Sequence, residues 1–394
     1  MEKELLQSLE GRHPAYKMPF SDLLTGLTAE VDAGNVSMKE NGEGLQIYCY
    51  TMQATIERNW NVFSAMSRGL ILDVENKKIV ATPFCKFWNF GEVHYIPDED
   101  FVVTEKIDGS MGIVFYYNGR WQVATKGSFQ SEQSFWAMDY LNKNIDKTFL
   151  ESDITYLVEI VYAENRIVIP YDEDGLYILS TYRAGFEEAL GMPINVPESL
   201  RIAGFKVPKC YGYESIDSIV ADAKVLHMFE EGFVVRFFNG HRIKIKGDEY
   251  CRVHRLISNC TPLFIWDCMR ACHDMDSLRS ELPEEFHKDF DSIRIILECK
   301  FYGLLDELKK GVETHNCYSD KELGQMLNDA RYSVGIAPVI RQFIFASRKS
   351  EFLKKVLTEG RERSKMFKLI RPTANDLDGY VPSSVMNRFE NEVL

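Results

Sequence analysis

The chain has 394 residues, of which 45% are hydrophobic and 27% are charged. These values are ordinary for globular domains, and the length allows two or three domains, each with its own core. No apolar run approaches the ~20 residues that a membrane-spanning helix needs. The net charge of −13 excludes a protein that binds nucleic acid through a generally basic surface, although it leaves room for a local basic groove.

Cysteine usage and the first residues indicate the compartment. The nine cysteines are odd in number and scattered through a chain that is too large to need disulfide cross-links. The N-terminal segment MEKELLQSLEGRHP lacks the basic and then apolar layout of a signal peptide. We therefore expect a cytoplasmic protein that does not associate with membranes.

Predicted β-strands dominate the first two-thirds of the chain. These segments are rich in β-branched and aromatic residues and are separated by Gly, Asn, Asp or Pro. They cover residues 44–51, 69–74, 77–84, 111–117, 121–127, 154–162, 175–182, 231–238 and 241–246. Helical periodicity occurs between them at 131–145 and 215–229.

The pattern changes at about residue 256. Beyond it, the segments 263–286, 290–312 and 321–346 carry apolar residues at spacings of three and four, which predicts helices. A strand-rich part followed by a helical part predicts an α+β domain of antiparallel sheets with helices over 1–255. A smaller all-α domain is predicted over 256–394.

A lysine in a sharp turn is the first candidate for chemistry. The segment VTEKIDGSMGIVF contains the pattern Lys-x-Asp-Gly at Lys106, Asp108 and Gly109. A turn of this kind, placed just after a strand, can present an amine to a phosphate group in a pocket. By itself the pattern is more typical of a surface turn, so the other motifs must decide between the two interpretations.

The Asn-Gly pair at 239–240 predicts a hairpin that gathers charged residues. A two-residue loop would make residue 235 face residue 244 and residue 233 face residue 246, and side chains alternate between the two faces along a strand. The residues placed on one face are then Glu231, Phe233, Val235, Lys244 and Lys246. A carboxylate and two amines between apolar walls would suit a metal-bound polyphosphate. The alternative is a solvated hairpin with charge pairs.

The Asn-Gly pair at 118–119 predicts a second hairpin, in which Lys126 lies opposite Met111 and therefore beside the Lys106 turn. Glu159 lies within a strand that reads as buried, where a carboxylate is costly unless it has a partner. Arg68 and Lys86 are further cations beside strands and aromatic residues, and each alone is more typical of a structural than of a catalytic role.

These segments occur in an order that resembles the covalent nucleotidyltransferases, which include DNA ligases, RNA ligases and mRNA capping enzymes. Within that superfamily the chain resembles the RNA ligase 1 group, typified by the tRNA-repair ligase of T-even bacteriophage. The similarity extends from about Arg68 to Tyr250, with looser similarity in the helical tail. The segments that carry it are Arg68-Gly69, KFWNFGE, EKIDG, TKGS with its extension KGSFQSEQS, LVEIV, ENRIVIPY, EGFVV and KIKGDEY.

The resemblance implies a three-step reaction that starts at Lys106. This lysine would attack the α-phosphorus of ATP, AMP would pass to an RNA 5′-phosphate, and a 3′-hydroxyl would then expel AMP. A lysine nucleophile must lose its proton, although its ordinary pKa is near 10.4. Neighbouring cations, namely a metal ion and Lys244 or Lys246, are therefore expected to disfavour the protonated amine.

The resemblance also assigns roles by position. Catalytic roles fall to Lys106, Lys244 and Lys246, and metal binding to Glu231 and Glu159. Lys244 and Lys246 would hold the α-phosphate, and Lys86 and Arg68 the outer phosphates. The full set that it implies for nucleotide binding is Arg68, Lys86, Glu105, Asp108, Gly109, Lys126, Glu159, Tyr177, Val234, Lys244 and Lys246.

The implied cofactors are ATP and Mg²⁺, with Mn²⁺ as an alternative metal. The implied partner is RNA with 5′-phosphate and 3′-hydroxyl ends, with cleaved tRNA as one candidate, and the helical domain would select the substrate. No P-loop pattern occurs in the sequence, so end preparation would need a separate polynucleotide kinase/phosphatase. A monomer from a phage or a bacterium fits these expectations.

Two other functions remain open at this stage. An mRNA guanylyltransferase or a DNA ligase would share the motifs but usually appends a β-barrel, whereas the sequence after Tyr250 reads as helical. A catalytically silent RNA-end-binding protein would be expected to lose one of the motif residues, all of which are present. Cys260, Cys268 and Cys272 with His273 suggest zinc, but they lack the spacing of a closed four-ligand site.

Overall fold

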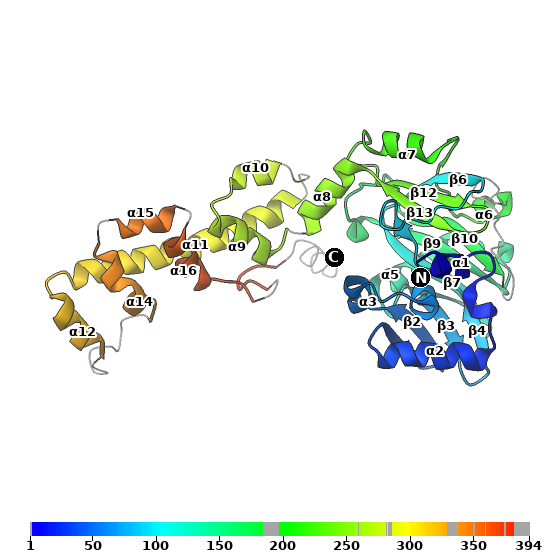
Figure 1. The fold of residues 1–394 in the computed structure, drawn as a ribbon, viewed down its shortest axis with the longest axis horizontal. Coiled ribbons are helices and arrows are strands. Elements are labelled where there is room, and N and C mark those ends of the chain that lie inside the picture. Colours follow the sequence, from blue (N-terminus) through cyan, green and yellow to red (C-terminus); the bar gives the residue numbers. More distant parts are fainter. Residues whose placement is uncertain are drawn as a thin grey trace. The chain divides into compact units, whose positions relative to one another are not determined.

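A computed structural model of the chain describes residues 2–183, 197–258, 260–280, 282, 286–328, 338–349, 351–358, 360–373 and 376–381. Contacts divide it into two compact units, Met1–Arg252 and Val253–Leu394. The boundary predicted from the sequence was 255/256. The first unit is an α+β domain and the second is helical, so the predicted fold class is confirmed (Figure 1).

The first sheet of the first unit is antiparallel with the order β1-β2-β3-β4. Its strands are Val36–Glu40, Leu45–Tyr50, Arg68–Asp73 and Lys78–Ala81. One face is covered by α2 (Phe20–Asp32) and α4 (Val62–Met66), whose apolar side chains meet those of β2 and β3. Figure 1 shows α2 lying along this sheet.

The second sheet has the order β10-β9-β7-β8 and is also antiparallel. Its strands are β7 (Ser110–Tyr117), β8 (Arg120–Thr125), β9 (Ile154–Val161) and β10 (Gly175–Arg183). One face packs on the first sheet through buried residues such as Ile47, Ile113 and Leu157. The other face is covered by α5 (Glu132–Asn144) and α6 (Glu198–Ile202).

The third sheet has the order β11-β6-β12-β13-β5, in which only the β13–β5 pair is parallel. Its strands are β5 (Trp88–Asn89), β6 (Phe101–Glu105), β11 (Cys210–Tyr211), β12 (Gly232–Phe237) and β13 (Arg242–Lys246). Helix α7 (Ile216–Ala223) packs on one face, as Figure 1 shows above β12 and β13. The opposite face of β12 and β13 carries the polar side chains described below.

Short helices complete the first unit. They are α1 (Glu2–Ser8), η1 (Pro14–Tyr16), α3 (Met52–Glu57), η2 (Lys147–Phe149) and η3 (Ala163–Asn165). All nine predicted strands are present. The strands β1, β5, β6 and β11 and the N-terminal helices were not predicted, because they are short or lie at sheet edges.

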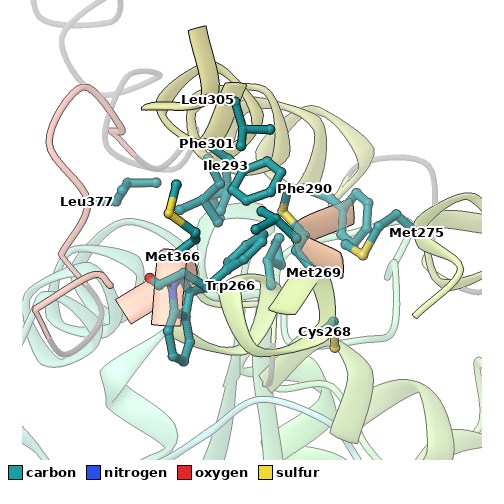
Figure 2. Packing of buried hydrophobic residues seen from close by; sticks show 14 of the residues in the cluster. Trp266, Cys268, Met269, Met275, Phe290, Ile293, Phe301, Leu305, Met366 and Leu377 are labelled. Carbon is teal, nitrogen blue, oxygen red and sulfur yellow. Dashed lines mark hydrogen bonds between the residues drawn. The ribbon is translucent and has the colours of Figure 1, made fainter. Parts of the chain in front are cut away.

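The second unit is built around one long helix, α11 (His287–Thr314). The helices that accompany it are α9 (Pro262–Arg270), α10 (Met275–Ser280), α12 (Asp320–Asn328), α14 (Pro338–Ser347), α15 (Phe352–Leu357) and α16 (Arg361–Lys368), and α8 (Asp248–Ser258) spans the boundary. Figure 2 shows Trp266 beside Met366 in the apolar core, which also contains Phe301 and Ile293. The indole Nε1 of Trp266 donates to the carbonyl of Phe367 at 2.8 Å, which satisfies its one polar atom.

Within the described residues, no helix combines the length and the apolar character that crossing a membrane requires.

Candidate active site

One cavity of ≈ 480 Å³ in the first unit collects most of the predicted site residues. Its walls come from all three sheets and from the turn between β6 and β7. The predicted residues that line it are Arg68, Glu105, Lys106, Gly109, Lys126, Glu159, Val234, Lys244 and Lys246. Four other predicted residues lie outside this lining, namely Lys86, Asp108, Tyr177 and Glu231.

Lys106 occupies the turn that joins β6 to β7. Its backbone N–H donates to the carbonyl of Gly232 at 2.9 Å, which ties the turn to the start of β12. Gly109 lets the turn approach β9 closely, since a Cβ at this position would lie 2.5 Å from the carbonyl oxygen of Ile160. The Lys-x-Asp-Gly pattern is therefore a packed turn inside the cavity wall and not a surface turn.

The amine of Lys106 is ion-paired. Its Nζ lies 2.8 Å from Oε2 of Glu231, and Nζ of Lys246 lies 2.7 Å from the other oxygen of the same carboxylate. Glu231 is only 3% exposed, so its two oxygens are shared between two lysines in a poorly solvated place.

The sign of the pKa shift on Lys106 differs from the expectation. Burial favours the neutral amine, but the carboxylates of Glu231 and Glu159 outweigh burial and raise the pKa of Lys106 above its ordinary value. Neighbouring cations were expected to lower the pKa of Lys106, but Glu231 and Glu159 reverse the sign of the shift. At neutral pH, Lys106 with these partners is therefore an ammonium group.

The register predicted for the 231–246 hairpin is wrong by one residue. Val234 pairs with Lys244 and Gly232 with Lys246, because the loop contains residues 238–240 and not only 239–240. The lysines consequently share a face with Val234, whereas Phe233 and Val235 point to the apolar core under α7. Phe233 and Val235 therefore do not line the cavity, and Val234 is the apolar residue of this strand that does.

Glu231 reaches the lysines by a different route from the one predicted. It lies just before β12, and the next residue, Gly232, has a φ of 130°, a conformation that side-chain-bearing residues rarely adopt. A Cβ at Gly232 would lie 2.2 Å from the carbonyl oxygen of Ile245. This glycine allows the chain to turn so that the carboxylate points at Lys106 and Lys246.

Lys244 is the amine whose pKa is lowered. Burial, followed by the charges of Arg68 and Lys106, lowers the pKa of Lys244 to about 7. Phe87 lies between two of these cations, with its ring centroid 5.3 Å from Nζ of Lys244 and 5.1 Å from Cζ of Arg68. Nη1 of Arg68 is buried without a hydrogen-bond partner among the described residues, which suits a group that binds an anion.

Glu159 is the second carboxylate of the cavity. Burial raises the pKa of Glu159 to about 7, and the opposing charge of Lys106 only partly offsets burial. Tyr177 pairs with Glu159 across β10 and β9, and its ring lies 5.7 Å from Nζ of Lys206.

Asp108 points away from the cavity into a hydrogen-bond network. Its carboxylate accepts from the hydroxyl of Tyr250 at 2.9 Å and from the backbone N–H groups of Val168 and Ile169 at 3.0 and 3.2 Å. Its own N–H donates to the hydroxyl of Tyr171 at 2.7 Å. Asp108 therefore holds the Lys106 turn in place in this structure, and Tyr250 supports Asp108.

The 118–119 hairpin has the predicted register. Gly112 pairs with Thr125 and Tyr117 with Arg120, around Asn118 and Gly119, which both have positive φ. The lysine that follows, Lys126, lines the cavity as expected.

Two arginines of the cavity were missed by the sequence analysis. Arg236 and Arg242 pair across β12 and β13 and both line the cavity while being less than one-tenth exposed. The ring of Phe84 lies 4.4 Å from Cζ of Arg242. The alternation of Arg242, Lys244 and Lys246 along one strand was a signal that could have identified Arg242, because residues two apart share a face.

Within the described residues, no group of three or more His, Cys, Asp and Glu side chains is arranged to hold a metal ion. The two carboxylates near Lys106 nevertheless suit a hard divalent cation, since Mg²⁺ commonly takes one or two carboxylates and completes its shell with substrate phosphates and water. The raised pKa of Glu159 fits a carboxylate whose charge a cation would stabilise.

Residues 66–250 match a family model described as RNA ligase. A protein of Autographa californica nuclear polyhedrosis virus, described as "Putative bifunctional polynucleotide kinase/RNA ligase", is 30% identical over 217 residues, covering 48% of this chain and 30% of that protein. A "Putative RNA ligase" of Thermovibrio ammonificans is 28% identical over 209 residues, covering 48% of this chain and 52% of that protein. The chain thus spans about half or less of the length of these curated relatives.

Among solved structures, an archaeal ATP-dependent RNA ligase is 14% identical, with a TM-score of 0.41, over 95% of this chain and 98% of that chain. The cavity itself, with a lysine in its wall and basic side chains around it, has the charge to bind an anionic ligand. Residues 66–250, which match the RNA ligase family model, contain this whole site.

Proposed function

We propose that the protein is an ATP-dependent RNA ligase that joins 5′-phosphate and 3′-hydroxyl RNA ends through a Lys106–AMP intermediate. The observation that carries the proposal is the gathering of Lys106, Lys244, Lys246 and Arg68 in one cavity of a domain from the RNA ligase family. A buried group of cations is costly unless an anion binds among them, and a triphosphate supplies that anion.

In the first step, Nζ of Lys106 would attack the α-phosphorus of ATP. A P–N bond forms, the bond to the β-phosphate oxygen breaks, pyrophosphate leaves, and the amine gives up its proton. Lys244 and Lys246, which face the cavity from β13, are positioned to bind the α-phosphate oxygens and to stabilise the charge that develops there. Arg68, with its unsatisfied Nη1, is assigned to the outer phosphates.

The ion pair with Glu231 must open before Lys106 can react. A divalent metal ion held by Glu159 and Glu231 would supply positive charge to the phosphates. When these two carboxylates are occupied in that way, they no longer stabilise the ammonium form, and the pKa of Lys106 falls. The lowering expected from the sequence would then appear only in the nucleotide complex.

The later steps use the same cavity. The RNA 5′-phosphate would attack the lysyl-AMP, so that the P–N bond breaks, a phosphoanhydride forms and Lys106 recovers its proton. A 3′-hydroxyl would then attack the activated phosphate, forming the phosphodiester and releasing AMP. We assign the adenine contacts to Glu105 and Val234, which line the cavity.

Incubation with α-labelled ATP or GTP and a divalent metal tests the proposal. The expected result is an acid-labile, base-stable adduct with ATP that is absent in Lys106→Ala. Lys209→Ala, the loss of an exposed lysine from the same unit, is a matched control and should still label. A preference for GTP would favour an mRNA guanylyltransferase, and no adduct at all would favour a silent RNA-end-binding protein.

The RNA substrate is part of the proposal. We take cleaved tRNA or another single-stranded RNA as the substrate class, with the helical second unit selecting it and a separate kinase/phosphatase preparing the ends. A ligation panel of 5′-phosphorylated linear RNA, cleaved tRNA and nicked duplex RNA tests this assignment. Preference for the nicked duplex would contradict it.

A further inference from the structure

A second cavity in the first unit, of ≈ 360 Å³, has a different chemical character from the first. Its lining includes Lys86, Trp60, Trp88 and Arg58, and it shares no lining residue with the cavity around Lys106. Two indole rings and two cations thus lie in one hollow, together with the carboxylates of Glu2 and Glu92.

Lys86 lies inside an aromatic cage. Its Nζ is 4.6 Å from the ring centroid of Trp60, 5.2 Å from that of Trp88 and 5.6 Å from that of Tyr50. Burial lowers the pKa of Lys86, and the charge of Glu92 does not fully offset this. The three rings attract the ammonium group through cation–π contacts and bring no opposing charge to it.

The two carboxylates that line the cavity, Glu2 and Glu92, accept hydrogen bonds from other residues. Glu92 accepts from the backbone N–H of Asn89 at 2.9 Å and from the Asn89 side-chain amide at 2.7 Å. Glu2 accepts from the backbone N–H of His94 at 2.7 Å. Over the part of the chain that the structure describes, neither Lys86 nor Arg58 forms an ion pair, so both cations are available to an anion.

The rim of the cavity is apolar and exposed. Arg58 ends α3 in the left-handed conformation, with φ of 55°, and the helix before it presents Met52 and Ile56, each 74% exposed. Residues four apart lie on one helix face, so the two apolar side chains form a common patch beside the cavity.

The two cavities are neighbours. The ring of Tyr50 lies 5.6 Å from Nζ of Lys86 and 5.3 Å from Nζ of Lys126, which lines the cavity around Lys106. One aromatic side chain therefore separates the cation of the second cavity from a cation of the first.

We propose that the second cavity binds one nucleotide of the RNA strand to be sealed, with its unpaired base against Trp60 and its phosphate between Lys86 and Arg58. Aromatic side chains stack on any base, and lysine and arginine neutralise the backbone phosphate. The site requires an unpaired base, because a base inside a duplex cannot present its face to the indole. The inference rests on the proposed function and supplies a physical reason for a single-strand preference. In this proposal Lys86 binds an RNA phosphate, whereas the sequence resemblance had implied that it binds the outer phosphates of ATP.

The test separates the ATP step from the RNA step. Trp60→Leu keeps an apolar side chain but removes the stacking surface, and Trp60→Phe should restore most of it. For Trp60→Leu we expect kcat/KM for a short 5′-phosphorylated single-stranded RNA to fall about tenfold or more, the loss expected for one stacked base. Lys106–AMP formation from ATP should stay within about twofold. Phe149→Leu, which alters an exposed aromatic residue outside this cavity, is the matched control.

The cation is tested in the same way. Arg58→Asn is the suitable change, because asparagine tolerates positive φ. Lys77→Asn is its matched control, since Lys77 is an exposed cation with nearly the same backbone conformation, φ of 53°. Arg58→Asn should weaken RNA use and reduce its salt dependence, while Lys77→Asn should do neither.

Two results would overturn the inference. Unchanged RNA kinetics in both Trp60→Leu and Arg58→Asn would show that the cavity does not bind RNA, and a parallel loss of adenylation and RNA use would assign it to ATP. Quenching of tryptophan fluorescence by the same RNA, measured without ATP, tests the cavity even if wild-type protein forms no adduct. Absence of the adduct removes the proposed ligase, whereas quenching that Trp60→Leu does not diminish removes the RNA subsite.

Discussion

The two units of the chain place their charges differently. In the first unit, Glu231 is buried and Glu159 and Lys244 are half-buried around a cavity. Burial raises the pKa of Glu159 and lowers the pKa of Lys244. In the second unit, ion pairs such as Arg294 with Asp276 lie at the surface, around an interior filled by residues such as Trp266. A fold gains little from burying charge, because desolvation offsets the attraction between the groups. The buried charges of the first unit are therefore better explained by ligand binding than by stability.

The largest expected effect comes from Glu231→Gln. The change leaves Lys106 and Lys246 without their shared carboxylate, and it removes a proposed metal ligand. We expect the maximal rate of self-adenylation to fall at least ~100-fold, in line with the loss of a positioned electrostatic group. Because Glu231 raises the pKa of Lys106, the remaining activity should extend to lower pH.

Glu230→Gln is the matched control for that measurement, since Glu230 is the exposed neighbour in sequence. The pH–rate profiles of both variants and of the wild type decide the matter. A wild-type rate in Glu231→Gln would contradict the role given to this carboxylate.

Trp266→Ala should affect the stability of the second unit and leave the activity of the first unit unchanged. The indole is 7% exposed and packs in the core that Figure 2 shows, so its loss should destabilise the second unit by ~3–5 kcal/mol. Self-adenylation by the first unit should be unaffected. Urea unfolding followed by circular dichroism, together with the labelling assay, measures both quantities.

Tyr302→Ala serves as the comparison, because Tyr302 lies on α11 but is 54% exposed and should cost much less. If Trp266→Ala abolished labelling, the site of the first unit would depend on the second unit, and the contrast between them would not hold.

The smallest expected effect is a pH dependence of ATP binding. A lysine with a lowered pKa is charged below that value and neutral above it, so Lys244 should lose its charge as the pH rises through about 7. The dissociation constant for ATP should then rise by up to ~10-fold per pH unit, from about pH 7 up to the higher pKa that Lys244 takes when ATP binds. Calorimetry of the wild-type protein with α,β-methylene ATP, which binds without reacting and leaves Lys106 in place, measures this dependence.

Lys244→Arg should flatten that profile, because arginine stays charged over the whole range. A profile that is as steep in Lys244→Arg as in the parent would assign the titration to another group.

Part of the candidate site could be predicted from local pattern. The 118–119 hairpin has the predicted register because both turn residues accept positive φ. The 239–240 hairpin does not, because residue 238 joins its loop and the carbonyl of Asn239 accepts from the N–H of Gly11 at 2.6 Å. That contact joins the hairpin to the N-terminal segment, and no local rule reports it.

The order of motifs from Arg68 to Tyr250 predicted the resemblance to RNA ligases and nine of the residues that line the cavity. The periodicities on either side of residue 256 predicted the fold class. Local sequence suffices for these features because strand alternation and turn geometry are properties of neighbouring residues. Only the tertiary structure decided that Glu231 forms an ion pair with Lys106 and that Asp108 accepts a hydrogen bond from Tyr250. It also decided that Lys86 lines a second cavity. Burial and charge pairing depend on groups that are far apart in the chain, so their balance exists only in the folded protein.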